Sequence, residues 1–161
     1  MKHLWSPWRL EYLTAPKSGE CVFCHAAQST DDRENLVLLR EERCFMILNR
    51  FPYNNGHFMV VPYDHVPTLE ALDAETLTNM MLLLNRGLAA LRATMQPQGF
   101  NIGANLGHAA GAGIEEHVHL HAVPRWVGDT NYMPIIGNMR VVPETWQMTY
   151  DTLKAALQSS T

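Results

Sequence analysis

The sequence predicts an α+β fold built around an antiparallel sheet. Short apolar runs bounded by turn-forming or charged residues indicate strands, and two longer segments carry apolar residues at the helical spacing of three and four. Their order along the chain is three strands, a helix, two strands and a second helix. The length of 161 residues, without repeats or linkers, predicts a single domain over residues 1–161.

Three strand candidates follow one another in the first half of the chain, at residues 36–39, 44–48 and 58–61. The preceding segment 29–35 is polar and turn-like. Asn54-Asn55-Gly56 stands just before the third run, and an Asn-Gly pair is a strong hairpin signal. We therefore expect these three strands to form an antiparallel meander.

One amphipathic helix is expected after Asp73, because aspartate often caps helix N-termini. Apolar residues then recur at spacings of three and four until Pro97 and Gly99 end the pattern. They are Leu77, Met80, Met81, Leu84, Leu88, Leu91 and Met95. A last helix is expected from Pro143 onward. Its apolar stripe consists of Trp146, Tyr150, Leu153 and Leu157.

The two remaining strand candidates, residues 100–106 and 117–123, flank a glycine-rich loop. Side chains alternate along a strand, so His117, His119 and His121 share one face, about 6.6 Å apart at a rise of about 3.3 Å per residue. Three imidazoles in a row are costly to desolvate and are rarely chosen for a solvent-facing stripe. This strand therefore predicts a chemical site.

Two kinds of chemistry fit this histidine face. In a metal site all three imidazoles would be ligands, since imidazole is the commonest zinc ligand. In nucleophilic catalysis one imidazole attacks phosphorus while its neighbours fix its tautomer. The loop at 107–113 favours the second, because its glycines let backbone N–H groups approach a phosphate. It is not a P-loop, since it leads into a strand and no Gly-Lys-Ser/Thr follows.

Residues 117–123 closely resemble the signature of the histidine triad family, His-apolar-His-apolar-His followed by two apolar residues. Residues 56–65 are similar to the family's Gly-His strand with its later proline and histidine. Within the family, segments 5–9, 49–50, 52–57 and 124–126 resemble the branch of diadenosine tetraphosphate phosphorylases and hydrolases. The resemblance implies a HIT-like fold: an antiparallel five-stranded sheet with one long and one C-terminal helix, usually in a homodimer.

The resemblance also implies a role for each matching residue. His119, the middle histidine of the triad, would be the nucleophile that takes the nucleotidyl group. His121 and His57 would line the phosphate site and support the transfer. Asn105 would contact the α-phosphate, and Asn49 would bind the ribose hydroxyls at a position where the family often has aspartate. An amide can still donate and accept toward a diol.

The sequence departs from the family pattern just before the triad. Many members have Gly-Gln-Ser or Gly-Gln-Thr there, whose side chains donate to the phosphate, whereas Gly113, Ile114 and Glu115 occupy this stretch. We therefore expect recognition by backbone N–H groups, with Gly111, Gly113 and Ile114 as the candidates. His108, in the same loop, is a candidate contact to a distal phosphate.

Cys21 and Cys24 form a Cys-x-x-Cys pair followed by His25. These letters also spell a c-type haem attachment motif, but no export signal accompanies them, and a thioredoxin-like redox pair would need a βαβ context. The remaining interpretations are half of a tetrahedral zinc site and a pair of reduced, unliganded thiols. Cys44, inside a strand candidate, is expected to be a core residue.

The histidine triad resemblance extends the zinc interpretation. Family members with this cysteine pair often bind a structural zinc with two histidines, which implies His65 and His117 as the further ligands here. Such a site would anchor the N-terminal segment 1–30 on the core and act on stability. No organic cofactor is expected.

Composition restricts the partners. A net charge of −4 and a pI of about 6.0 argue against binding to nucleic-acid polymers or anionic membranes. No run of about 18 apolar residues or signal peptide is visible, so we expect no membrane span and reduced thiols in a cytoplasmic protein.

Trp5, Trp8 and Trp126 either pack in the protein or stack on the second base of a dinucleotide.

Together these features predict an enzyme that cleaves dinucleoside polyphosphates such as diadenosine tetraphosphate. The reaction would pass through a covalent nucleotidyl-His119, with phosphate or water as the acceptor, so the enzyme would be a nucleotidyltransferase or a hydrolase. Three alternatives remain open: a nucleoside phosphoramidate hydrolase, a nucleotide-binding or sensing protein with little turnover, and a metalloenzyme with all three triad histidines as ligands.

Overall fold

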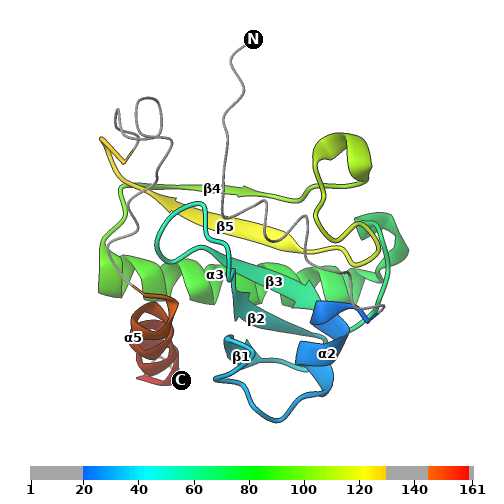
Figure 1. The fold of residues 1–161 in the computed structure, drawn as a ribbon, viewed down its shortest axis with the longest axis horizontal. Helices are drawn as coiled ribbons and strands as arrows, with labels where there is room; N and C mark the ends of the chain where they lie inside the picture. Colours follow the sequence, from blue (N-terminus) through cyan, green and yellow to red (C-terminus); the bar gives the residue numbers. More distant parts are fainter. Residues whose placement is uncertain (1–19, 130–144, 160–161) are drawn as a thin grey trace.

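A computed structural model describes residues 20–129 and 145–159 (Figure 1). In these residues five strands form one antiparallel sheet in the order β1-β2-β3-β5-β4. The strands are β1 (Val37–Arg40), β2 (Cys44–Leu48), β3 (Phe58–Pro62), β4 (Gly99–Gly103) and β5 (Leu120–Arg125). The helices are α2 (Val22–Gln28), α3 (Ala74–Met95) and α5 (Trp146–Ser159), with short 3-10 helices η1 (Leu69–Ala71) and η2 (His108–Ala110). The predicted α+β fold, with one long and one C-terminal helix, is confirmed.

The meander of β1, β2 and β3 is also confirmed, with pairs such as Leu48 opposite Phe58. Its second connection, residues 49–57, is longer than the expected hairpin turn. The chain reverses where the His57 N–H donates to the Asn54 carbonyl at 3.1 Å, and Gly56 there has a φ of +79°. This loop therefore places His57 at the start of β3.

Helix α3 covers the rear face of the sheet in Figure 1. The Asp73 side chain caps it by accepting from the Thr76 N–H at 2.6 Å, as the sequence predicted. Met81, part of the predicted stripe, is 50% exposed, whereas Leu83 is buried. Gly87 lies on the buried face and approaches the side chains of Phe58 and Met46 closely, whereas Met81 falls outside the contact.

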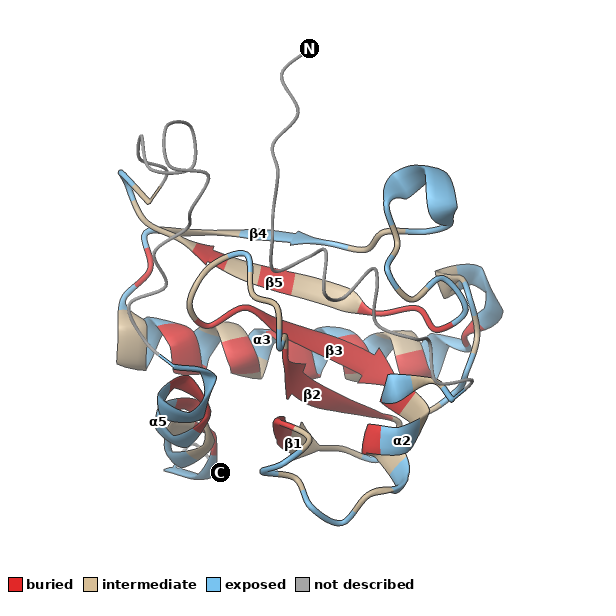
Figure 2. Cartoon of the chain, viewed as in Figure 1, coloured by how far each residue is buried: buried red, intermediate tan, exposed pale blue. Residues whose placement is uncertain are grey.

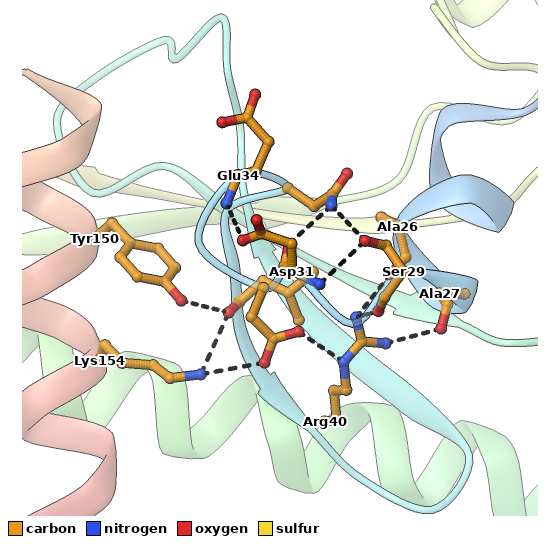
Figure 3. Close-up of polar contacts among 11 residues, drawn as sticks. Ala26, Ala27, Ser29, Asp31, Glu34, Arg40, Tyr150 and Lys154 are labelled. Carbon is orange, nitrogen blue, oxygen red and sulfur yellow. Dashed lines mark hydrogen bonds and ion pairs between the residues drawn. The ribbon is translucent and has the colours of Figure 1, made fainter.

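Helix α5 packs on α3 and β1 through the buried side chains of Tyr150, Leu153 and Leu157. Trp146, also on the predicted stripe, is 40% exposed. Figure 3 shows the polar contacts beside this helix: the Tyr150 hydroxyl donates to the Val37 carbonyl at 3.1 Å.

Arg40, at the end of β1, holds the short helix α2. Its guanidinium donates to the carbonyls of Ala26 and Ala27 at 2.7 and 3.0 Å and to that of Ser29 at 3.0 Å (Figure 3). Its Nε also donates to Asp32 at 2.8 Å. Because the last carbonyls of a helix lack partners within it, this one side chain fixes the C-terminal end of α2 against the sheet.

The two strands that flank the glycine-rich loop differ from their predicted bounds. The fifth strand begins at Leu120 instead of residue 117, because the Val118 N–H donates to the Val66 carbonyl at 2.7 Å and not to β3. The fourth strand ends at Gly103 instead of residue 106, since pairing with β5 stops at His121. His117 and His119 therefore lie in the irregular chain that leads into β5.

Burial follows the layers of the fold (Figure 2). Strands β2 and β3 are buried throughout, whereas β4, at the edge of the sheet, is largely exposed. Along β5, Ala122 is buried while His121 and Val123 are only partly covered, so the histidine lies on the face away from α3.

Several predictions fall outside the described residues. They concern Trp5, Trp8, the start of the last helix at Pro143 and residues 1–19 of the N-terminal segment. That the chain forms one domain over 1–161 therefore stays a prediction. Within the described ranges, no helix combines the length and apolar character that crossing a membrane requires.

We predict that Gly87→Ala destabilises the protein. A Cβ atom there would lie 2.4 Å from Phe58 Cζ and 2.9 Å from Met46 Cε. Overpacking costs about 1–3 kcal/mol and the gain in helix propensity returns about 1 kcal/mol, so we expect a net loss centred on about 1 kcal/mol. Urea unfolding measures it. Asn85→Ala, on the exposed side of the same helix, is the control; an unchanged midpoint for Gly87→Ala would contradict the packing.

Candidate active site and metal centre

The structure brings five histidines into a row across one face of the sheet. Neighbouring ring centroids lie 5.0 Å apart for His65 and His117, 4.8 Å for His119 and His121, and 5.1 Å for His121 and His57. The residues come from the segment after β3, the chain entering β5, β5 itself and the loop before β3. Their hydrogen bonds divide the row into a part suited to chemistry and a part suited to metal binding.

His119 is held in one tautomer by its own chain. Its Nδ1 lies 2.8 Å from the His117 carbonyl oxygen, and a carbonyl can only accept, so Nδ1 carries the proton. The Nε2 lone pair has no hydrogen-bond partner in the part of the chain that the structure describes. The side chain is 6% exposed, and burial lowers the pKa of His119 below the ordinary 6.5, against the smaller opposing effect of the bond to His117. A neutral imidazole with an available nitrogen is the state that a nucleophile needs.

His57 and His121 form a relay that begins at a backbone donor. The Tyr53 N–H donates to His57 Nδ1 at 3.1 Å, which leaves the proton of His57 on Nε2. Nε2 in turn donates to His121 Nδ1 at 2.9 Å, so His121 carries its proton on Nε2. Asn49 Nδ2, 3.5 Å from His57 Nε2, is too distant to compete. The relay thus presents His121 to the site as a hydrogen-bond donor.

A groove of about 440 Å³ runs over β4 and β5 beside His121. Asn105 and Tyr53 line it near His121, and Arg125 lines it farther along β5. Asn49 is not among the residues that line this groove; its side-chain oxygen accepts from the Phe51 N–H at 2.8 Å. The structure therefore joins Asn105 to the histidines at the groove and leaves Asn49 beside His57.

The glycine-rich loop is exposed and folds around η2. The Gly111 N–H donates to the His108 carbonyl at 2.9 Å, so the expectation that it binds a phosphate does not fit the loop as it stands. No backbone carbonyl among the described residues accepts from the N–H groups of Gly113 or Ile114. His108 Nδ1 pairs with Glu115 Oε1 at 2.8 Å, and this contact joins the two ends of the loop.

The second part of the row is a cluster of four potential metal ligands: Cys21, Cys24, His65 and His117. Their ligand atoms lie within 4.8 Å of one another. His65 Nδ1 is 3.2 Å from Cys24 Sγ, and His117 Nδ1 is 3.4 Å from Cys21 Sγ. In a tetrahedral zinc site with bonds of about 2.3 Å to sulfur and 2.0 Å to nitrogen, neighbouring ligand atoms lie about 3.5 Å apart. The donor set and its spacing fit zinc.

The surroundings of His117 support this fit. Its Nε2 lies 2.9 Å from the Pro62 carbonyl, which places the proton on Nε2 and turns the Nδ1 lone pair toward the thiols. Burial lowers the pKa of His117, which favours the neutral form that a metal ligand needs. In the described ranges no metal-binding group gathers all three triad histidines, so the metalloenzyme alternative is not supported.

Some contacts that shape the site were not anticipated from the sequence. The Asp129 side chain, 8% exposed, accepts from Arg125 Nε at 2.6 Å and from Asn54 Nδ2 at 3.0 Å. This ties the loop carrying His57 to the end of β5. The indole N–H of Trp126 donates to the Met95 carbonyl at 3.3 Å, a packing role at the end of α3. From the sequence, the resemblance at 124–126 marked this region, and packing was one of the two alternatives open for Trp126.

Comparisons with known proteins agree with this geometry. The HIT domain family matches residues 31–127. A Mycobacterium tuberculosis protein named AP-4-A phosphorylase is 38% identical over 153 residues, covering 89% of this chain and 78% of its own. A Zn-bound histidine triad family protein from Mycobacterium smegmatis superposes with a TM-score of 0.70 at 29% identity, over 89% of this chain and 96% of its own. The Plasmodium falciparum diadenosine triphosphate hydrolase shares the fold, with a TM-score of 0.62 at 19% identity, over 80% of this chain and 77% of its own.

We predict that His119→Gln weakens the dependence of stability on acid pH. Burial lowers the pKa of His119 in the folded protein, whereas the unfolded chain protonates this residue as pH falls through about 6.5. Acid therefore favours unfolding. Because this residue takes up at most one proton, it changes the unfolding free energy by at most about 1.4 kcal/mol per pH unit. Urea unfolding at matched metal content, from about one pH unit above 6.5 to about one and a half units below it, measures the unfolding free energy of the parent and of His119→Gln. The slopes of this free energy against pH are then compared. Equal slopes would show that His119 is protonated when folded.

Proposed function

This chain belongs to the histidine triad (HIT) domain family, and we propose that it cleaves dinucleoside polyphosphates through a nucleotidyl-His119 intermediate. One observation carries the proposal: His119 is buried, its Nδ1 proton is committed to the His117 carbonyl, and its Nε2 lone pair is left beside the His121 donor. The similarity to the AP-4-A phosphorylase supports a substrate of the diadenosine tetraphosphate type.

In the first step, His119 Nε2 attacks the α-phosphorus, an N–P bond forms and the P–O bond to the remaining polyphosphate nucleotide breaks. The attacking ring becomes cationic, and its Nδ1–H bond to the His117 carbonyl strengthens as it does so. His121 Nε2–H donates to the phosphate oxygens, where negative charge develops. His57 keeps His121 in the donating tautomer.

In the second step, an oxygen of inorganic phosphate or water attacks the same phosphorus and the N–P bond breaks, which returns neutral His119. With diadenosine tetraphosphate the first step releases ATP. The second releases ADP when phosphate attacks and AMP when water attacks. The similarity to a named phosphorylase favours phosphate as the acceptor.

Substrate contacts follow from the groove. Asn105 lines it together with His121, which supports Asn105 as a donor to the α-phosphate. The N–H groups of Gly113 and Ile114 are the further proposed donors. Asn49, beside His57, is the candidate for the ribose hydroxyls. The open edge of β4 is suited to pairing with a second copy of the chain, so we propose a homodimer.

Zinc is the proposed metal for Cys21, Cys24, His65 and His117, and when bound it would supply a fixed tetrahedral centre. These residues then join α2 to the chain entering β5. His117 contributes at both levels, since its side chain is a ligand and its carbonyl orients His119. The proposed role of the metal is structural.

We predict that purified protein converts diadenosine tetraphosphate to ATP and a second nucleotide. Chromatography with mass detection, with and without inorganic phosphate, identifies the acceptor. ADP formed only with phosphate indicates a phosphorylase, and AMP in both conditions indicates a hydrolase. Absence of turnover in both would reject this substrate and direct the assay to nucleoside phosphoramidates or to a binding function.

His119→Ala tests the nucleophile in the same assay. Loss of the N–P bond-forming group should lower the rate by at least about 10³-fold, as removing a covalent catalyst does. His25→Ala, an exposed histidine of α2, is the matched control and should keep full activity. Full activity in His119→Ala, or no acid-labile adduct on the parent protein, would rule out the covalent scheme.

We predict that Cys24→Ser lowers both the zinc content and the unfolding temperature. Serine replaces a thiolate ligand by a poor one, so most of the bound metal should be lost. Elemental analysis and thermal unfolding provide the measurements. Cys44→Ala is the control, because Cys44 is buried in β2 and is not one of the four clustered ligands, so this variant should keep the metal. Equal zinc content in the parent and Cys24→Ser would contradict the site.

A further inference from the structure

Phe23 links the metal cluster to the proposed nucleophile. It lies between the two cysteines in the sequence, at the start of α2, and is only 2% exposed. Its ring contacts two histidines, with centroids 5.4 Å from His117 at an interplanar angle of 76° and 4.8 Å from His119 at 56°. Its neighbour Val22 is 53% exposed, so of these two adjacent apolar side chains only Phe23 enters the site.

The position of Phe23 is restricted from both sides. Cys21 and Cys24 flank it, and their sulfur atoms lie 3.4 and 3.7 Å from His117 Nδ1. The far end of α2 is held by the Arg40 guanidinium through three carbonyls. A shift of the cysteines relative to His117 would therefore move the Phe23 ring.

The His119 ring depends on such a neighbour for its orientation. One hydrogen bond, from Nδ1 to the His117 carbonyl, fixes one edge of the ring but permits rotation about that edge. The rings of Phe23 and His121 each approach it to 4.8 Å. These two contacts set the direction in which Nε2 points.

We propose that Phe23 is a positioning residue that transmits the geometry of the Cys21–Cys24–His65–His117 cluster to the ring of His119. The metal site then affects the rate of nucleotidyl transfer in addition to stability. This inference rests on the proposed covalent function for its kinetic readout, whereas a chemical readout of His119 is independent of that function.

The kinetic test compares Phe23→Ala, Phe23→Leu and the exposed control Val22→Ala, each with verified zinc content. Because a misplacement of about 1 Å can cost about 10²-fold in rate, Phe23→Ala should lower kcat by about 10- to 100-fold while KM changes by less than about threefold. Phe23→Leu keeps bulk against the ring and should restore most of kcat. Val22→Ala should match the parent. A loss that appears in KM alone, or an unchanged kcat in Phe23→Ala, would overturn the proposal.

A second test removes the metal with a chelator from the parent, Val22→Ala and Phe23→Ala. Modification of His119 by diethyl pyrocarbonate, measured at the peptide level by mass spectrometry, reports how the ring is covered without any substrate. Metal removal should raise the modification rate in the parent and in Val22→Ala. In Phe23→Ala the rate should already be raised and should change little, since coupled sites are not additive.

The two tests separate the possible failures. An additive effect of metal removal in Phe23→Ala, equal in factor to that in the parent, would show that the cluster does not act through Phe23. A parent protein without turnover would contradict the proposed function, and the modification rates would still decide the coupling. Circular dichroism confirms that each metal-free sample is folded; where one is not, the Phe23→Ala and Phe23→Leu comparison in the zinc-loaded protein decides.

Discussion

The site depends on the need of buried imidazoles to satisfy their N–H groups. Leaving a buried donor without a partner costs about 1–3 kcal/mol, so each ring takes the tautomer that its nearest backbone group dictates. The Pro62 carbonyl sets His117, the His117 carbonyl sets His119, and the Tyr53 N–H sets His57. Each assignment places a lone pair or a proton where the proposed chemistry requires it. The backbone thus determines which ring nitrogen is available to a substrate or a metal.

The same constraint explains how the proposed metal binding and the proposed group transfer can share one short stretch of chain. His117 offers Nδ1 to the thiols and its carbonyl to His119, so the two parts meet within three residues. Phe23 packs across the junction. A site built in this way is stiff because moving any member exposes an unpaired polar group or a cavity. Stiffness at His119 suits the proposed reaction, which relies on the alignment of one nitrogen with phosphorus.

Much of the fold was predictable from local patterns. Hydrophobic periodicity located β2, β3 and α3, and Asp73 marked the helix start because its capping bond is local. The alternation at 117–121 indicated a chemical site, and the family resemblance supplied the ligand pairing of His65 and His117. The exact bounds of β5 were wrong because the Val118 N–H pairs with Val66, a contact between segments that no local pattern records.

The sequence by itself determined which residues could do chemistry: the three spaced histidines, the cysteine pair and the glycines of the loop. Only the tertiary structure decided which nitrogen of each histidine carries the proton, that the Gly111 N–H is used inside the loop, and that Phe23 contacts His119. The reason is physical. Residue type fixes the donors and acceptors available, but their pairing depends on distances between segments that only the folded sheet brings together.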